Sequence, residues 1–520
     1  MMTYSLLDDP LFRARSADDA VEALTLPAVL HRLADADAPA ITSFEALQAH
    51  QQQPWYQFLV QLGALCAARA MGGPVPASPK RWRTALLALA DDNGAAWHLV
   101  VDDLAQPAFL QPPVPEGRLD GFKDDLPTPD TLDYLVASKN HDLKVARITQ
   151  PRPAHWIYAL ITLQTLEGYS GRYNYGIARM NGGLGNRPLV GLSPALEWGR
   201  RFRRDVQVLL DARGSLAERY DLNGPALLWT IPWDGAKNST LSLEALDPYF
   251  IEVCRRIRFT ADEDGTLTCW RTSTKAARID APDDLNGITG DPWTPIDKGE
   301  AKALTLGGNG FTYQKLHQIL LSGDYQKPPA LEVRAGDDGL LYLVAQTLVR
   351  GQGKTEGLHH RIVAVPKKVA TLFGRKTERE QLAARAQARI EQAGTVQSKV
   401  LYRAVGTLLN GGNPDDVDGD AVQPWLEAFD RAVDNAFFPK LWASVAMDPD
   451  EAAADWQRVL RDAAETQFHD AETRTPRTAT RYWRARSTAQ SIFWGTLREQ
   501  LPKAFPNQAS APRTTEAPAT

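Results

Sequence analysis

The chain changes its pattern of Gly, Pro and apolar residues near residue 375, and this change limits the folds that it can adopt. From about 150 to 370, Gly and Pro recur between short β-rich runs such as "LLYLVAQTLV" and "ALLWTIPWDG". That pattern is typical of a mixed α/β region with irregular loops. After "GRKTERE", apolar residues follow helical spacing near 377–409, 422–447, 450–472 and 477–501. Four helices joined by short connections favour an antiparallel bundle.

We therefore predict an α+β chain in three parts. Residues 1–375 form an irregular mixed α/β body, residues 376–502 form a four-helix bundle, and residues 503–520 form a tail whose composition is typical of disorder. With 520 residues, of which 43% are hydrophobic, the chain can bury a sizeable core.

The cysteines and the N-terminal residues bear on the location of the protein. Three scattered cysteines, Cys66, Cys254 and Cys269, are too few for a disulfide framework or for paired zinc ligands. Asp8 and Asp9 stand where a signal peptide needs a basic and then an apolar region, and no run approaches the length of a membrane span. These features predict a cytoplasmic protein that neither crosses a membrane nor holds a structural metal.

One acidic run partly matches a calcium-binding loop. In "DVDGDAVQPWLE", Glu427 follows Asp416, Asp418 and Asp420 at the twelfth place of such a loop. Ala421 replaces the glycine that the sixth position requires, and Pro424 disturbs the path of the chain. The plainer interpretation is an acidic loop between helices, in which Asp420 caps the following helix.

The formal net charge of −5 argues against a protein that binds nucleic acid over its whole surface, but basic residues gather in one region. Between Lys139 and Asp205, eleven Lys and Arg stand against four Asp and Glu, so this region carries +7 and the remainder of the chain −12. The region includes "YSGRYNYGIARMNGGLGNRPLVGL", in which closely spaced glycines let a ligand approach the backbone. It also includes "WGRRFRRD". Both stretches are either ligand-binding surfaces or ordinary solvated turns and helix faces.

The segment "LVRGQGKTEGLHH", residues 348–360, contains a Gly-Lys-Thr like that of a nucleotide-binding P-loop. A P-loop needs a glycine five positions before Gly353, where this chain has Leu348. The flanking runs both have the pattern of strands, whereas a phosphate loop opens into a helix. The segment therefore predicts the tip of a β-hairpin, and a nucleotide hydrolase built on Lys354 and Thr355 is the weaker alternative.

Other catalytic signals are weak. His359 and His360 follow the tip, but neighbouring strand residues face opposite sides and do not easily share a metal. The sequence contains no G-x-S-x-G, no H-E-x-x-H and no paired-carboxylate signature. We predict that the protein is not an enzyme.

Three fragments considered together are more specific: "RMNGGLGNRPLVGL" (179–192), "GITGDPWTPIDKGEAKALTLGGNGFTY" (287–313) and "VRGQGKTEGLHHR" (349–361). Their order, the opening "YSLLDDPLF" and the helical C-terminal part resemble the large subunit of the type I-E CRISPR complex Cascade, the CasA family. The resemblance implies a non-catalytic subunit of an RNA-guided antiviral ribonucleoprotein. Such a subunit recognises the protospacer-adjacent motif (PAM) on double-stranded DNA, starts R-loop formation and helps recruit a helicase-nuclease.

The resemblance also implies the partners and the site residues. Expected partners are duplex target DNA, CRISPR guide RNA, the other Cascade subunits and the helicase-nuclease, with no cofactor. Members of the family read the motif in the minor groove with a glycine loop, a lysine finger and a glutamine-bearing hairpin wedge. The DNA contacts implied here are Gly182, Gly183, Gly185, Asn186, Lys275, Arg350, Gly351, Gln352, Gly353 and Lys354.

Two of these assignments rest on position. "TSTKAARID" occupies the region of the lysine finger, so Lys275 is the first choice and Arg278 the substitute. "VASKNHDLK" occupies the place of a loop that contacts the RNA-bearing backbone of the complex, which implies contacts by Asn140 and His141. A helical adaptor whose C-terminal bundle carries the function remains a further alternative.

Overall fold

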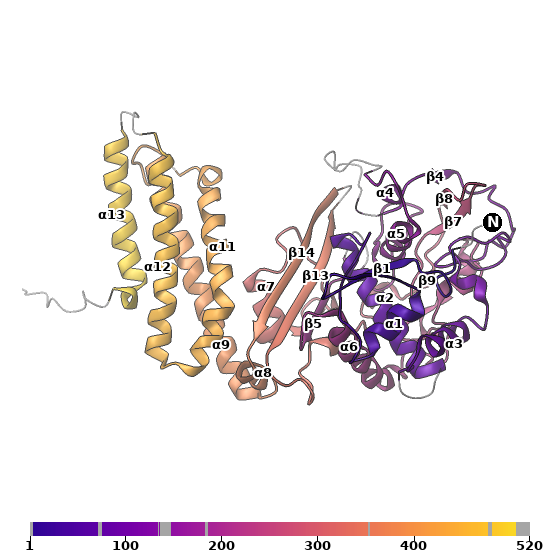
Figure 1. Cartoon of the computed structure of the whole chain (residues 1–520). Coiled ribbons are helices and arrows are strands. Elements are labelled where there is room, and N and C mark those ends of the chain that lie inside the picture. The colour runs from indigo at the N-terminus through magenta and orange to yellow at the C-terminus, as the bar shows by residue number, and fades with distance from the viewer. Residues whose placement is uncertain are drawn as a thin grey trace, which may run out of the picture. The chain divides into compact units, whose positions relative to one another are not determined.

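The computed structural model describes residues 4–70, 75–133, 135, 147–181, 186–351, 354–415, 417–476 and 481–505 (Figure 1). The chain forms two units: the first comprises 1–311 and 324–363, and the second comprises 312–323 and 364–520. The first mixes helices with small sheets and the second is helical, which confirms the predicted α+β class. The division also assigns residues 312–323 and 364–375, which the sequence pattern placed in the body, to the helical unit.

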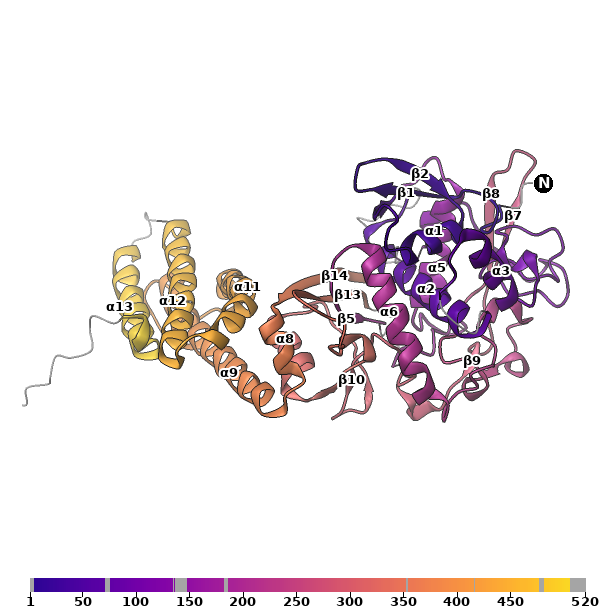
Figure 2. The same ribbon diagram turned by 60° about the horizontal axis from the view of Figure 1, so that its bottom comes forward.

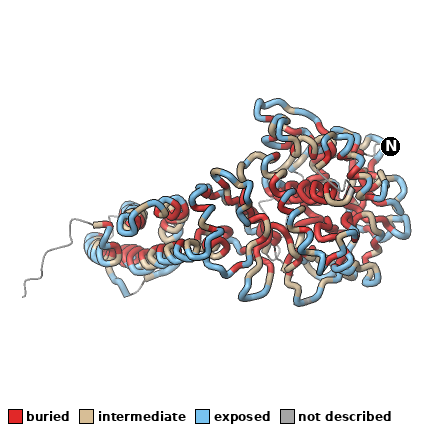
Figure 3. The backbone as a smooth tube through the Cα atoms, turned by 90° about the horizontal axis from the view of Figure 1, so that it is seen from below, coloured by how far each residue is buried: buried red, intermediate tan, exposed pale blue. Residues whose placement is uncertain are grey.

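Two helices form the centre of the first unit. Almost every side chain of α2 and α5 is buried, and the two helices contact each other, while α2 also packs on α6 (Figure 2). Trp55 of α2 stacks on Phe12 and meets Tyr158 of α5 edge-on, so aromatic rings fill the space between these elements. Buried backbone consequently runs through the middle of this unit (Figure 3). Its helices are α1 (Leu26–Ala34), α2 (Gln52–Leu65), α3 (Pro79–Leu89), α4 (Pro129–Leu132), α5 (Pro153–Leu166) and α6 (Trp198–Arg213).

Short sheets surround these helices. Three-stranded sheets have the orders β2-β1-β3, β4-β8-β7, β11-β10-β12 and β14-β13-β5, and β6 pairs with β9. The longer strands are β1 (Phe12–Ser16), β2 (Val21–Leu24), β3 (Ile41–Phe44), β4 (Asp124–Leu126), β5 (Leu189–Ser193), β7 (Arg256–Ala261), β8 (Leu267–Thr272), β13 (Leu341–Gly351) and β14 (Lys354–Val365). The two-residue strands are β6 (Leu241–Ser242), β9 (Ile279–Asp280), β10 (Ile296–Asp297), β11 (Lys302–Ala303) and β12 (Tyr325–Gln326).

The predicted hairpin is confirmed, because β13, which ends at Gly351, and β14, which begins at Lys354, are neighbours in one sheet. Eight of the eleven residues of β13 are buried, without alternation, whereas β14 alternates between exposed and half-buried positions along most of its length. This difference fits their places in the sheet, since β13 lies between two strands and β14 is an edge strand.

The run "ALLWTIPWDG" is not the strand that its composition indicated. It contains a short 3-10 turn, Leu228–Thr230, and only a bridge from Leu227 to Ile251. The carbonyls of Leu228 and Ile231 accept hydrogen bonds from the Arg278 guanidinium instead of joining a ladder. A buried side chain therefore takes the hydrogen-bonding groups that a strand would have used.

Long helices dominate the second unit, near the positions that their periodicity predicted. Within the described ranges, the α-helices of this unit are α7 (Tyr313–His317), α8 (Lys367–Phe373), α9 (Lys376–Thr395), α10 (Tyr402–Leu409), α11 (Gly419–Ala443), α12 (Pro449–Arg474) and α13 (Tyr482–Gln500). A π-helical turn, Val396–Leu401, joins α9 to α10. Rings pack between the helices, as where Phe468 of α12 stacks on Phe493 of α13 at 4.3 Å between centroids.

The caps of two helices show where the chain turns. Asp418 caps α11 by accepting hydrogen bonds from the amides of Asp420 and Ala421, so the capping residue is Asp418 and not Asp420. Asp448 caps α12 in the same way. None of the helices in the described part of the chain has both the length and the hydropathy that crossing a bilayer requires. Of the predicted disordered tail, 503–520, residues 503 and 504 belong to a 3-10 turn, Pro502–Ala504, and residues 506–520 lie outside the described ranges.

Candidate nucleic-acid interface

Two asparagines anchor the glycine stretch, whose residues Gly182, Gly183 and Gly185 lie outside the described ranges. Before it, Asn181 Nδ2 donates to Ala303 O at 3.3 Å. After it, Asn186 Nδ2 donates to Leu306 O at 2.8 Å, and Leu306 N donates to Asn186 Oδ1 at 3.3 Å. Both ends are thus attached to the segment 303–306, which belongs to the second of the three fragments singled out in the sequence.

The same fragment approaches Met180 closely at Gly287. This glycine has φ +77°, and a Cβ there would lie 2.5 Å from the carbonyl carbon of Met180. Only glycine tolerates both the left-handed backbone and the close approach. The glycine that opens "GITGDPW" is therefore required because its backbone packs against Met180 and Asn181, just before the glycine stretch.

The third fragment joins the other two through the hairpin sheet. Strand β5 follows Asn186 and pairs antiparallel with β13, from Leu189↔Gln346 to Ser193↔Tyr342. Thr347 of β13 donates its hydroxyl to Asn186 Oδ1 at 3.4 Å.

The His359 ring, on β14, packs directly on Gly310, since a Cβ on that glycine would lie 2.2 Å from His359 Nδ1. Arg361, also on β14, donates a hydrogen bond to Phe311 O. His359 therefore packs on the "GGNG" turn, which assigns it a structural contact. The structure thus brings all three fragments together.

Asn186 is placed differently from the expectation. It is only 4% exposed, and its amide is engaged by Leu306 and Thr347. The predicted direct DNA contact by this side chain is therefore replaced by a positioning role at the end of the glycine stretch. Asn181 has the matching role at the other end, and the symmetry of "MNGGLGN" was the signal that could have identified it.

At the hairpin tip, Lys354 and Glu356 form an exposed ion pair. Lys354 Nζ lies 3.0 Å from Glu356 Oε1, with 55% of the lysine side chain exposed. Arg350 and Gly351 are half-buried at the end of β13, while Gln352 and Gly353 lie outside the described residues. Glu356 lies so close that a Cβ on Gly351 would be 2.6 Å from its Oε1, so a side chain at this position would displace the glutamate.

The geometry of Lys354 and Thr355 excludes the P-loop interpretation. Both residues are in strand β14 and no helix follows the tip, whereas a phosphate loop needs a helix N-terminus there. Thr355 Oγ1 donates to Leu135 O at 2.8 Å and is therefore engaged by the protein.

This threonine attaches the hairpin to the start of the segment that contains Asn140 and His141, two predicted contacts outside the described residues. Leu135 N donates to Asp133 Oδ1, and the same buried carboxylate lies 2.9 Å from His50 Nε2. At the other end of the segment, Ile148 N donates to Asp130 Oδ2 at 2.7 Å. Buried carboxylates thus fix both ends of the segment.

Lys275 is exposed, but its backbone is held on two sides. Its amide donates to Gly235 O at 2.7 Å, and its carbonyl accepts from the Tyr175 hydroxyl at 3.3 Å. The neighbouring Thr274 amide donates to Tyr173 O. The lysine is therefore presented from a fixed turn beside the tyrosines that precede the glycine stretch.

The substitute for the lysine finger, Arg278, is excluded by its surroundings. It is 3% exposed and donates to the carbonyls of Leu228, Ile231, Pro232 and Ser239. Its guanidinium also lies over the Trp233 ring. Four carbonyl acceptors and an aromatic face bind this cation inside the protein, where it cannot contact DNA.

Several arginines of the basic region are also internal. Arg187 Nε lies 2.7 Å from Asp291 Oδ2, and Arg179, 2% exposed, lies over the Phe250 ring near Asp291 and Glu252. Burial raises the pKa of Glu252, and the Arg179 charge opposes that rise.

On α6, Arg204 makes two hydrogen bonds to the Asp337 carboxylate. Acidic residues far away in sequence thus neutralise part of the +7 region. Arg179, Arg187 and Arg204 are buried, so they belong neither to a ligand-binding surface nor to a solvated turn or helix face.

The cysteines are free and buried. Burial raises the pKa of Cys254 to about 12, so this thiol is protonated at neutral pH. Among the residues that the structure describes, no group of three or more His, Cys, Asp or Glu is arranged to hold a metal ion.

Comparison with solved structures gives the fold. The chain matches Thermus thermophilus CasA (Cse1) with a TM-score of 0.65, at 16% identity over 96% of this chain and 100% of that one. It matches Cse1 from Acidimicrobium ferrooxidans with a TM-score of 0.63 at 13% identity, over 97% and 99% of the two chains. Cse1 from Thermobifida fusca gives 0.63 at 15% identity, over 96% and 99%. The chain has the Cse1 fold.

No protein-family profile and no curated protein matches the sequence. The Cse1 fold extends over nearly the whole chain, including the three converging fragments. At identities of 13 to 16%, the likeness establishes the Cse1 fold alone, so the roles of individual side chains rest on the contacts described above.

Proposed function

We propose that this protein is the non-catalytic large subunit of a type I-E CRISPR surveillance complex. It recognises the PAM through the minor groove of target DNA, wedges open the duplex to start the R-loop, and helps recruit the helicase-nuclease. The observation that carries the proposal is the convergence of the three fragments through Asn186, β5 and β13. The Cse1 fold over 96% of the chain supports it.

The arrangement suits a reader of the minor groove. That groove displays a degenerate pattern of hydrogen-bonding groups, so a protein that reads it accepts several related motifs. The groove is narrow, and a backbone stretch rich in glycine can enter where side chains would clash. In our proposal, this stretch consists of Gly182, Gly183 and Gly185, and Lys275 is the lysine finger.

The hairpin suits a wedge. Separating the first base pairs costs a few kcal/mol of stacking and pairing, which a polar side chain at the tip can offset by occupying the gap. Gln352 both donates and accepts hydrogen bonds and can replace partners that the bases lose. Arg350 and Lys354 would supply positive charge beside it. Sequence specificity then passes to pairing between guide RNA and target strand, as in other RNA-guided effectors.

The proposed partners follow from this role. They are duplex DNA, the guide RNA, the other Cascade subunits and the helicase-nuclease, all in the cytoplasm. In this proposal, Asn140 and His141 contact the RNA-bearing backbone of the complex. Affinity purification of the tagged chain should recover a set of smaller subunits together with one RNA of uniform length. Recovery of the chain alone from cells that express the whole system would contradict membership of the complex.

The wedge is tested with Gln352→Ala in the assembled complex. A fluorescent base analogue at the first pair after the motif reports opening, and the anisotropy of a labelled duplex reports binding. We expect opening to slow at least tenfold while motif binding persists. Lys354→Ala is the matched control at the same tip, because it removes charge and should change salt-dependent affinity more than opening. Unchanged opening by Gln352→Ala with intact motif binding would refute the wedge role.

A further inference from the structure

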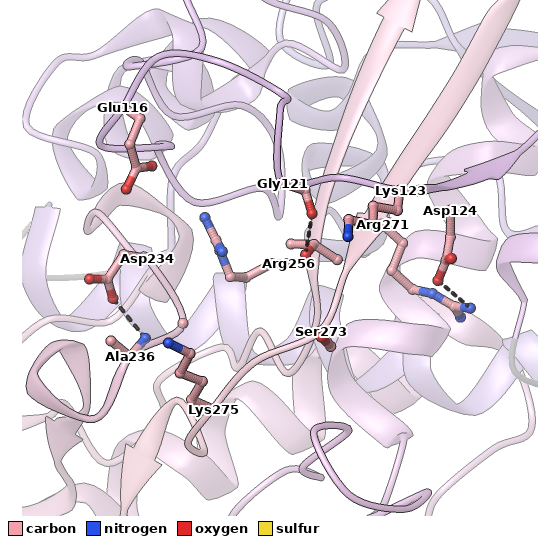
Figure 4. A pocket seen from close by; sticks show the side chains of 12 residues that line it. Glu116, Gly121, Lys123, Asp124, Asp234, Ala236, Arg256, Arg271, Ser273 and Lys275 are labelled. Carbon is pink, nitrogen blue, oxygen red and sulfur yellow. Dashed lines mark hydrogen bonds and ion pairs between the residues drawn. The ribbon is translucent and has the colours of Figure 1, made fainter.

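Beside Lys275, the first unit contains a polar cavity of about 540 Å³ (Figure 4). Its walls come from the loop before β4, from the turn at Gly235, and from the adjoining ends of β7 and β8. Thr272 Oγ1 donates to Gly121 O at 2.7 Å and ties two of these walls together. The cavity is large enough for a phosphate group with part of a sugar.

Four basic side chains face this cavity: Lys123, Arg256, Arg271 and Lys275. Arg271 is paired with Asp124, at 3.4 Å between Nη2 and Oδ2. Within the described ranges, the other three have no carboxylate within ion-pair distance. The cavity therefore offers cationic groups that the rest of the fold leaves available.

Arg256 occupies the middle of the cavity, with Glu116 and Asp234 on one side of it and Lys123 and Arg271 on the other (Figure 4). Its guanidinium lies over the Phe122 ring, 5.3 Å from the centroid, and donates no hydrogen bond to any described residue. The side chain is thus held from behind by an aromatic face while its donors remain free for a ligand.

The nearby carboxylates, Glu116 and Asp234, act on Arg256 through their charge but form no ion pair with it. Asp234 Oδ1 accepts from the Ala236 amide at 2.8 Å and from the Ser239 hydroxyl at 2.5 Å, so one of its oxygens is committed to its own turn. Glu116 is exposed and acts on Arg256 only through its charge. The turn itself is tight, because Gly235 has φ +78° and a Cβ there would lie 3.0 Å from Arg256 Cδ. The Gly235 turn, to which the Lys275 amide is hydrogen-bonded, therefore packs closely against the Arg256 side chain.

We propose that this cavity binds a backbone phosphate of the target duplex, with Arg256 as the principal donor and Lys123 as a supporting charge. The inference rests on the proposed function and adds a site to it. Phosphates line both edges of the minor groove, so a phosphate held beside Lys275 would set the depth at which that lysine enters the groove. Such a contact positions the duplex and carries no sequence information.

The test uses Arg256→Gln in the full chain within its complex. Binding of short fluorescent duplexes, with and without the motif, is measured over a series of salt concentrations. Losing one phosphate contact should weaken both duplexes about three- to tenfold and reduce the slope of log affinity against log salt by about 0.9. The ratio between the two duplexes should stay unchanged. Arg256→Lys, which keeps the charge, should recover the slope.

Two matched variants serve as controls for Arg256→Gln. Arg271→Gln removes a cation from the same wall that is already paired with Asp124, and should change the slope less than Arg256→Gln does. Glu116→Gln removes an opposing carboxylate and should tighten both duplexes. Melting temperatures close to that of the parent establish that each variant is folded.

Several outcomes would overturn the site. Unchanged affinity and slope in Arg256→Gln would exclude the phosphate contact, and loss of motif preference alone would make Arg256 a base-reading residue instead. If inorganic phosphate or a free nucleotide bound tightly through Arg256 while duplex binding did not depend on it, the cavity would serve a small anion. Failure of the parent complex to prefer the motif would refute the proposed function, whatever Arg256 does.

Discussion

The Asn186 amide provides the sharpest test of how the glycine stretch is held. Its side chain is 4% exposed and satisfies both the amide and the carbonyl of Leu306, with a third contact from Thr347, which is 1% exposed. Asn186→Ala would leave the two Leu306 groups unpaired in the interior, at about 1–3 kcal/mol each. We expect a loss of about 2–6 kcal/mol in the free energy of unfolding of the first unit.

An isosteric variant sharpens the prediction. In Asn186→Asp, one oxygen can still accept from Leu306 N, but the other faces Leu306 O in place of the donor, 2.8 Å away. Burial and this repulsion should raise the pKa of the new carboxyl above its unfolded value. The protonated form can donate to Leu306 O. The deficit relative to the parent should therefore shrink as the pH falls through the folded pKa, and reach its full size at higher pH.

The assay is urea denaturation with a readout confined to the first unit, such as hydrogen exchange of its peptides, because two units can unfold separately. Asn181→Ala is the control, since this partly buried residue makes one hydrogen bond of 3.3 Å to Ala303 and should cost about 0.5–1.5 kcal/mol. If Asn186→Ala and Asn186→Asp were both within about 0.5 kcal/mol of the parent, Asn186 would be a surface residue and the assigned positioning role would be wrong.

Three further predictions follow from the buried charges and the lysine turn. Arg278→Ala should lower the free energy of unfolding by about 3 kcal/mol or more, because it strands buried carbonyls, and a loss below about 1 kcal/mol in urea denaturation would contradict this. Lys275→Ala should leave stability within about 0.5 kcal/mol but weaken motif-dependent capture; equal binding by mutant and parent at several salt concentrations would exclude this lysine. Burial raises the pKa of Glu252, so its contribution is complete below the unfolded pKa and is lost as the pH rises through the folded one. Glu252→Gln should therefore gain stability relative to the parent from about pH 4 to about pH 7, and a constant difference would refute the raised pKa.

Local patterns were sufficient for much of the fold. Strands flanking a Gly-rich tip and helices with regular apolar spacing depend on neighbouring residues, so the β13–β14 hairpin and the helices after residue 375 were predictable. The same reasoning missed Leu228–Thr230, because the group that binds its carbonyls, Arg278, is about fifty residues further along the chain.

Charge shows the limit of the sequence most clearly. A count along the chain identified a region of +7, but Arg187 is neutralised by Asp291 and Arg204 by Asp337, each more than a hundred residues away. Arg256 drew no attention in the sequence, because Phe122, Asp234 and Lys275 become its neighbours only when three distant segments meet.

The sequence by itself determined where the β13–β14 hairpin and the long C-terminal helices form, since these depend on short-range pattern. Tertiary structure alone decided which polar side chains face the interior and which remain available to a ligand. The physical reason is that a buried charge or amide must find a partner wherever the fold provides one.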